Sequence, residues 1–72
     1  MNRLTKRRRN PGRLFIQVQD VMNVLGYAKT AAYQRLHTIK AAYGKLPHQR
    51  VTVKEFAEYE GIPIAEVRKR MQ

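Results

Sequence analysis

Apolar residues recur at helical spacing along most of this chain. Residues 14–18 form a short apolar run with alternation, which predicts a small strand or an extended lead-in. Residues 19–25 place three apolar side chains on one helical face, and Gly26 is expected to end that helix. Residues 28–43 predict the longest helix, because they include no proline or glycine and their apolar positions recur every three or four residues. These positions are Ala32, Leu36, Ile39 and Tyr43.

Two shorter helices are predicted in the C-terminal third. Thr52 and Glu55 have the spacing of a capping box, in which a hydroxyl and a carboxylate each accept a hydrogen bond from an otherwise unpaired backbone N–H. This helix is expected to reach residue 59 or 60 and to end at Gly61. Pro63 then opens a last helix, to about residue 71. The pattern predicts a mainly α, compact four-helix domain with at most a very short β-strand pair.

The four predicted helices form two similar pairs. Residues 16–36 align with residues 51–71 without a gap, and Val18, Gly26 and Arg35 meet identical residues in the second copy. Each copy reads as helix, glycine turn, helix. The pattern indicates either a duplication or two uses of one compact unit.

We assign both pairs to a single domain at 13–72, with a helix-turn-helix at 18–43 and a second helix pair at 52–71. Residues 1–12 are expected to form a flexible basic arm, because the cationic run Lys-Arg-Arg-Arg is followed at once by the turn signal Asn-Pro-Gly.

Composition removes most catalytic chemistry. The 72 residues include no Cys, no Trp and no Ser, which excludes disulfide scaffolds, cysteine zinc sites and Ser or Cys nucleophiles. His37 and His48 have no metal-ligating partners at suitable spacing. We therefore expect no enzyme, no cofactor, no metal and no small-molecule substrate. No apolar stretch is long enough to cross a bilayer, so a cytoplasmic protein is expected.

The net charge of +10 belongs entirely to the first fifty residues. Residues 1–50 hold eleven Lys and Arg against Asp20 alone, whereas residues 51–72 hold four cations and four Glu. A one-sided excess of this kind marks a surface that binds a polyanion. A membrane-binding helix would need bulky apolar residues opposite the cations, so nucleic acid is the favoured partner.

The outward side of residues 28–43 is suited to reading a DNA groove. It shows small and hydrogen-bonding side chains, while Lys29, Arg35 and Lys40 lie on its flanks. The predicted base contacts are Lys29, Thr30, Tyr33, Gln34 and His37. The predicted backbone contacts are Arg3, Lys6, Arg7, Arg8, Arg9, Arg13, Arg35, Lys40, Lys45 and Arg50. The other interpretation of Tyr33 and His37 is packing against the second helix pair.

These residues resemble the helix-turn-helix of small MerR-like and excisionase-like DNA-binding proteins. The resemblance rests on Val18, Asp20, Val21, Leu25, Gly26, Tyr27, Lys29, Thr30, Tyr33, Leu36 and the run from Gly44 to Pro47. The chain departs from the family pattern at Met22 and Ala28, and only three residues are left for the usual β-hairpin wing. The resemblance implies a transcription regulator or recombination accessory factor of a mobile element, bacterial or phage-encoded and nucleoid-associated.

Other interpretations stay open at this point. The second helix pair could serve an adaptor that binds a recombinase or regulator, and double-stranded DNA could be bound by a homodimer or by a cooperative array. RNA is a further candidate, although Tyr27, Tyr43 and Tyr59 are expected to face inward and to leave Tyr33 as the one exposed ring.

Overall fold

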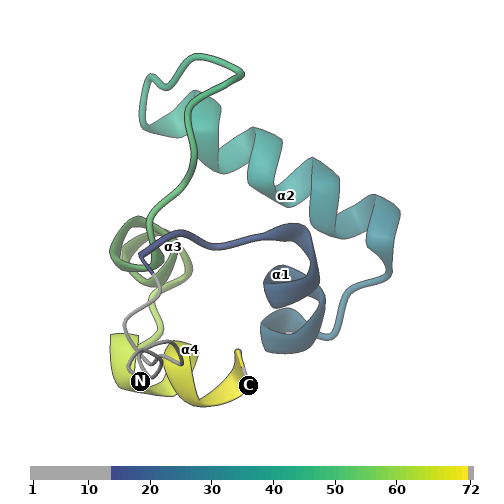
Figure 1. Cartoon of the computed structure of the whole chain (residues 1–72), viewed down its shortest axis with the longest axis vertical. Coiled ribbons are helices and arrows are strands. Elements are labelled where there is room, and N and C mark those ends of the chain that lie inside the picture. The colour runs from purple at the N-terminus through teal and green to yellow at the C-terminus, as the bar shows by residue number, and fades with distance from the viewer. Residues whose placement is uncertain (1–13, 72) are drawn as a thin grey trace, which may run out of the picture.

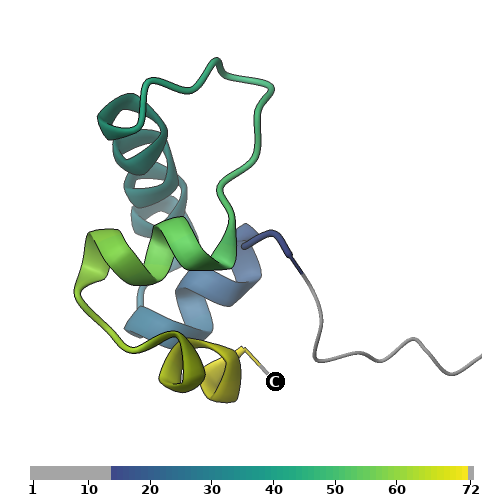
Figure 2. The same ribbon diagram turned by 90° about the vertical axis from the view of Figure 1, so that its left-hand side faces the viewer.

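The computed structural model describes residues 14–71, and four helices account for most of them. In chain order these are α1 (Val18–Leu25), α2 (Lys29–Ala42), α3 (Val53–Glu60) and α4 (Ile64–Arg70). The long helix α2 lies at one end of the molecule and α4 at the other, with α1 and α3 between them (Figures 1 and 2). The prediction of a mainly α four-helix domain is confirmed, whereas the predicted arm at 1–12 lies outside the described residues.

The glycine turns of the two helix pairs have the same conformation. Gly26 ends α1 with a φ of 73°, and Gly61 ends α3 with a φ of 71°. Both values lie in the left-handed region, which side chains other than glycine rarely adopt. The aligned glycines of the sequence repeat therefore make the same turn in both halves.

The first turns of α1 and α3 also match. Thr52 accepts a hydrogen bond from the Glu55 backbone N–H at 3.0 Å, and the Glu55 carboxylate accepts one from the Thr52 N–H at 2.9 Å, which confirms the predicted capping box. At the matching place in α1, the Asp20 carboxylate accepts a hydrogen bond from the Gln17 N–H at 2.7 Å. A carboxylate in a first turn is also favoured by the helix dipole.

The two halves meet through the extended segments that precede α1 and α3. Phe15 and Thr52 form an isolated antiparallel bridge. Beside it, the Ile16 N–H donates to the Val51 carbonyl at 2.9 Å, and the Val53 N–H donates to the Leu14 carbonyl at 2.8 Å. The lead-in at 14–18 is thus an extended segment in its first part, and Val18 already belongs to α1.

A single apolar core joins both halves. Phe56 on α3 is its largest fully buried side chain, and Ile39 on α2 and Val67 on α4 are also fully buried. The whole core consists of Ile16, Val21, Val24, Ala32, Ile39, Val51, Val53, Phe56, Ala57 and Val67. Every helix contributes to it, so neither helix pair buries its apolar face alone.

Two tyrosines do not face inward as predicted. Tyr43 and Tyr59 each keep 37% of their surface exposed. Tyr43 follows the last residue of α2, beyond the part of that helix covered by the core, and its hydroxyl donates to the Glu55 carbonyl at 3.2 Å. Helical spacing correctly gives the direction of a side chain, but it does not show where along the helix the covering surface ends.

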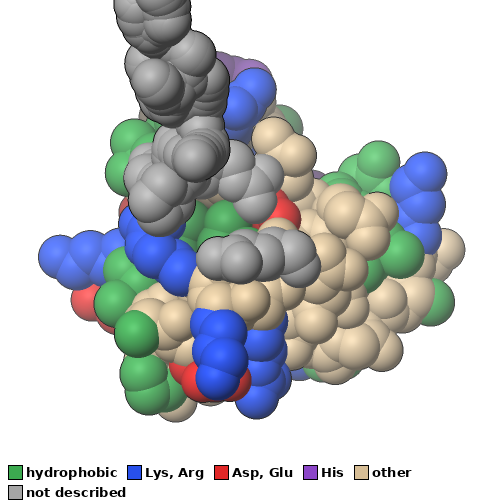
Figure 3. Space-filling model, turned by 60° about the horizontal axis from the view of Figure 1, so that its bottom comes forward, with side chains coloured by type: hydrophobic (Ala, Val, Ile, Leu, Met, Phe, Trp, Pro, Cys, Tyr) green, Lys and Arg blue, Asp and Glu red, His purple; other side chains and the backbone are tan. Residues whose placement is uncertain are grey.

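Charge is distributed differently at the two ends. The α4 end carries cationic, acidic and apolar side chains together (Figure 3). Within residues 14–50, in contrast, Asp20 is the one acidic side chain, and only 4% of its surface is exposed. The described surface of the first half therefore presents no exposed carboxylate.

Candidate nucleic-acid interface

The five predicted base-contact residues all lie exposed on α2. Thr30, Tyr33, Gln34 and His37 fall on the part of the helix that faces away from Ala32 and Ile39, the two α2 residues buried in the core, and Lys29 lies on the flank of that face. None of the five side chains makes a hydrogen bond or ion pair with any residue in 14–71. Packing of Tyr33 or His37 against the second helix pair, the other interpretation of these residues, would require burial that the structure does not show.

The start of α2 adds a feature that sequence reasoning did not use. Ala28 is the N-cap, so no side chain caps the helix, and the first turn contains no acidic residue. Backbone N–H groups in a first turn have no partner within the helix, and they favour an anion. Lys29 stands at this end although a cation there is disfavoured by the helix dipole. The missing side-chain cap is visible in the sequence, because position 28 holds an alanine where a capping residue is usual.

The predicted backbone contacts fall into two groups. Six of them lie outside the described residues, namely Arg3, Lys6, Arg7, Arg8, Arg9 and Arg13. The other four are described, and each has a partner within the molecule. Lys40 donates to the Pro47 carbonyl at 2.8 Å, Lys45 pairs with Glu55 at 3.1 Å, and the Arg50 guanidinium lies 5.6 Å from the centre of the Phe15 ring.

Arg35, a predicted phosphate contact, also has partners within the molecule. Its guanidinium donates to the Tyr27 hydroxyl at 2.7 Å and lies 3.5 Å from the Glu60 carboxylate. It is also 5.9 Å from the centre of the Tyr59 ring. The hydrogen bond to Tyr27 and the charge of Glu60 raise the pKa of Arg35, against the opposing effect of burial. Arg35 thus joins the two helix pairs, and 31% of its side chain stays exposed.

Arg70, the counterpart of Arg35 in the sequence repeat, also reaches the opposite half. It donates to the Val24 carbonyl at the end of α1 at 3.2 Å and pairs with Glu66 at 2.9 Å. Glu60, on the other side of this junction, has only 11% of its side chain exposed. Spacing alone places these residues on helix faces, but the packing of the two halves determines which of them meet.

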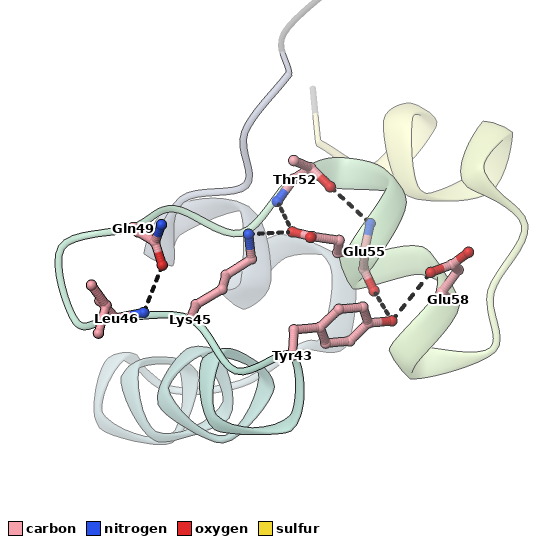
Figure 4. A network of polar contacts seen from close by, with 7 residues as sticks. All are labelled: Tyr43, Lys45, Leu46, Gln49, Thr52, Glu55 and Glu58. Carbon is pink, nitrogen blue, oxygen red and sulfur yellow. Dashed lines mark hydrogen bonds and ion pairs between the residues drawn. The ribbon is translucent and has the colours of Figure 1, made fainter.

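The segment between α2 and α3 is held against α3 by a polar network (Figure 4). Lys45 pairs with Glu55, and Tyr43 donates to the Glu58 carboxylate at 3.3 Å. The turn closes on itself, because Gln49 donates its N–H to the Leu46 carbonyl at 2.9 Å and accepts from the Leu46 N–H at 2.7 Å. Residues 44–50 form this compact turn, with no strand pairing of the kind a wing requires.

Glu55 gives this network a dependence on pH. Burial alone would raise the pKa of Glu55, but hydrogen bonds from Thr52 and the ammonium of Lys45 outweigh it and lower the pKa below its ordinary value. A lowered folded-state pKa stabilises the fold above the ordinary value, and that contribution is lost as pH falls through the lowered value. We expect the melting temperature to fall more steeply between about pH 5 and pH 3 in the wild type than in Glu55→Gln. Thermal unfolding followed by circular dichroism measures this, and parallel pH profiles would contradict it.

Residues 14–71 contain no cluster of three His, Cys, Asp or Glu side chains that could hold a metal ion. Within the same residues, no helix combines the length and the apolar character needed to span a bilayer.

Comparison of the chain with protein-family models, with curated proteins and with solved structures finds no match. The resemblance to MerR-like and excisionase-like proteins therefore stays a prediction from the motif residues.

Proposed function

We propose that this protein binds double-stranded DNA sequence-specifically, with α2 in the major groove. The observation that carries the proposal is the free face of α2, where five exposed side chains have no partner within residues 14–71. Unpaired hydrogen-bonding groups on a helix, beside a surface without exposed carboxylates, suit the edges of base pairs between two phosphate backbones.

We assign DNA contacts to individual residues of this face. Gln34 pairs with the two major-groove atoms of an adenine, and the methyl group of Thr30 contacts a thymine methyl. Lys29, at the end of the helix that enters the groove, reaches a guanine or a phosphate. Tyr33 lies about one turn beyond Lys29 and His37 about two turns beyond it. The cations of residues 1–13 supply sequence-independent affinity through the release of counterions.

The wider biological role follows from the resemblance alone. It implies a small transcription regulator or an excisionase-type recombination factor of a mobile element, acting in the bacterial cytoplasm on the nucleoid. A module of this size covers about 600–1,000 Å² of protein surface on DNA, so several copies are expected on one regulatory site.

Removal of the base-contacting groups of α2 is expected to relax base preference. Gln34→Ala and Thr30→Ala should each lose about 1–3 kcal/mol of discrimination at one base position, because the alanine side chain no longer favours one base over another. The measurement is selection of bound fragments from a random duplex pool, followed by affinities for the selected site and its single-base variants. Gln19→Ala on α1 is the matched control, since it removes the same amide from another exposed helical position.

Neutralisation of Arg7, Arg8 and Arg9 provides the contrast. This triple variant should bind every duplex more weakly and reduce the salt dependence, while base preference is kept. If the α2 variants and the arm variant behave alike, α2 does not read bases. Equal or tighter binding of single-stranded RNA in the same assay would favour the RNA alternative, for which Tyr33 offers the most exposed ring.

A further inference from the structure

The exposed starts of α2 and α4 differ in chemistry although the sequence repeat aligns them. Lys29 and Thr30 on α2 correspond to Ile64 and Ala65 on α4, and all four residues are exposed. Ile64 keeps 41% of its surface accessible. The position that offers a cation and a hydroxyl in the first half therefore offers an apolar surface in the second.

Ile64 borders a shallow hollow of about 480 Å³ between α3 and α4. The hollow has an apolar floor with one cation and one carboxylate on its rim. Its lining consists mainly of Ala57, Ile62, Pro63 and Ile64, with the charged pair Lys54 and Glu58. An apolar surface with a polar rim is the usual composition of a protein interface.

The two rim charges are available to a partner. Lys54 and Glu58 stand one turn apart on α3, and both are exposed. Lys54 forms no ion pair with any residue in the described range, and Glu58 accepts one hydrogen bond, from the Tyr43 hydroxyl at 3.3 Å. A lysine that precedes a glutamate by four positions is the less favourable order for a pair within one helix. Each charge can therefore face an opposite charge on another molecule.

We infer that this hollow is a self-association surface whose occupant is a second copy of the chain. In a two-fold arrangement each copy meets the same patch of the other, so one lysine and one glutamate give two complementary contacts. Lys54 of each copy faces Glu58 of its partner, and Ile64 of each copy enters the partner's hollow. Self-association through this hollow does not depend on DNA binding, and it is tested with the protein alone, without DNA.

The charge of residues 51–72 is compatible with a second copy as the occupant. Two chains of +10 repel each other, but residues 51–72 carry no net charge. The residues of the proposed contact therefore add no net repulsion between two copies. The described residues extend 41 Å along their longest axis, and the turn after α2 lies at the opposite end of the molecule from α4 (Figures 1 and 2). A nucleic acid is disfavoured there by Glu58 and by the apolar floor.

The small size of the hollow predicts weak association. Stable interfaces bury about 800 Å² on each partner, and smaller contacts belong to transient complexes. We expect a dimer with a dissociation constant of roughly 10–100 µM, which sedimentation equilibrium of the full chain can measure up to about 1 mM.

Charge reversal tests the pairing directly. Lys54→Glu and Glu58→Lys should each weaken self-association about tenfold or more, because both place like charges opposite one another in the two-fold contact. The two substitutions shift the net charge in opposite directions, so a common loss cannot result from net charge. An equimolar mixture of the two variants should restore association, since every cross-contact is then between opposite charges.

Ile64→Glu should abolish association, while circular dichroism confirms that each variant remains folded. The inference is overturned if the wild type is monomeric at every concentration, if either single reversal associates like the wild type, or if the mixture fails to recover. A monomeric wild type that still binds DNA would leave the proposed function in place. Loss of DNA binding by the α2 variants, in turn, says nothing about the dimer.

Discussion

Phe56→Ala is expected to destabilise the protein by about 3–5 kcal/mol. This is the largest loss of stability that we expect from any of the variants. Phe56 has no exposed surface and is the largest fully buried side chain of the core. Removal of its ring loses the burial of that ring and leaves a cavity among residues from both halves. A domain of this size is stabilised by only about 3–5 kcal/mol in total, so the variant should be largely unfolded at 37 °C.

Urea or thermal unfolding followed by circular dichroism measures this effect. Phe56→Leu keeps most of the volume and should lose much less stability than Phe56→Ala. Tyr33→Ala removes a ring of similar size from a site that is 55% exposed, and its free energy of unfolding should change by less than about 0.5 kcal/mol. A cooperative wild-type-like transition in Phe56→Ala would contradict the single shared core.

Arg35→Ala is expected to lower the free energy of unfolding by about 2–3 kcal/mol and to leave the salt dependence of DNA binding unchanged. The guanidinium contacts Tyr27, Tyr59 and Glu60, which lie in different halves of the molecule. The Glu60 Oε2 atom is buried and accepts no hydrogen bond from any residue in the described range, so Arg35 is the one cation seen to balance it. Without Arg35 this carboxylate would be left without a counter-charge.

A double variant separates this structural role from contact with phosphate. Arg35→Met with Glu60→Gln removes both charges and keeps the volume, and it should regain part of the stability lost in Arg35→Ala. Lys29→Ala is the comparison for binding, because it should reduce the salt dependence without lowering stability. If Arg35→Ala instead leaves stability unchanged and weakens binding to all duplexes, then Arg35 contacts the DNA backbone.

The local structure of this protein was predictable because its signals are local. The capping box at Thr52, the glycines that end α1 and α3, and the absence of breakers in α2 act within one or two helical turns. The same spacing correctly predicted that the polar face of α2 is exposed, because Ala32 and Ile39 determine which side is buried. Residues 19–25 and 28–43 matched the observed helices to within one residue at each end.

Contacts between the halves were not predictable in this way. Arg35 and Glu60 are both compatible with a solvent-exposed position in helical projection, and Arg70 gives no local sign that it reaches the Val24 carbonyl. Tyr43 was assigned to the core because the apolar pattern continues to the end of α2, although the covering surface stops earlier.

The sequence by itself determined the four helices, their ends, the one-sided charge and the side chains that α2 turns outward, because each depends on residues a few positions apart. Only the tertiary structure decided which cations remain unpaired, and that an exposed isoleucine and two opposite charges gather beside one hollow. The physical reason is that burial and ion pairing are set by the packing of the two helix pairs around Phe56, and that packing joins residues far apart in the chain.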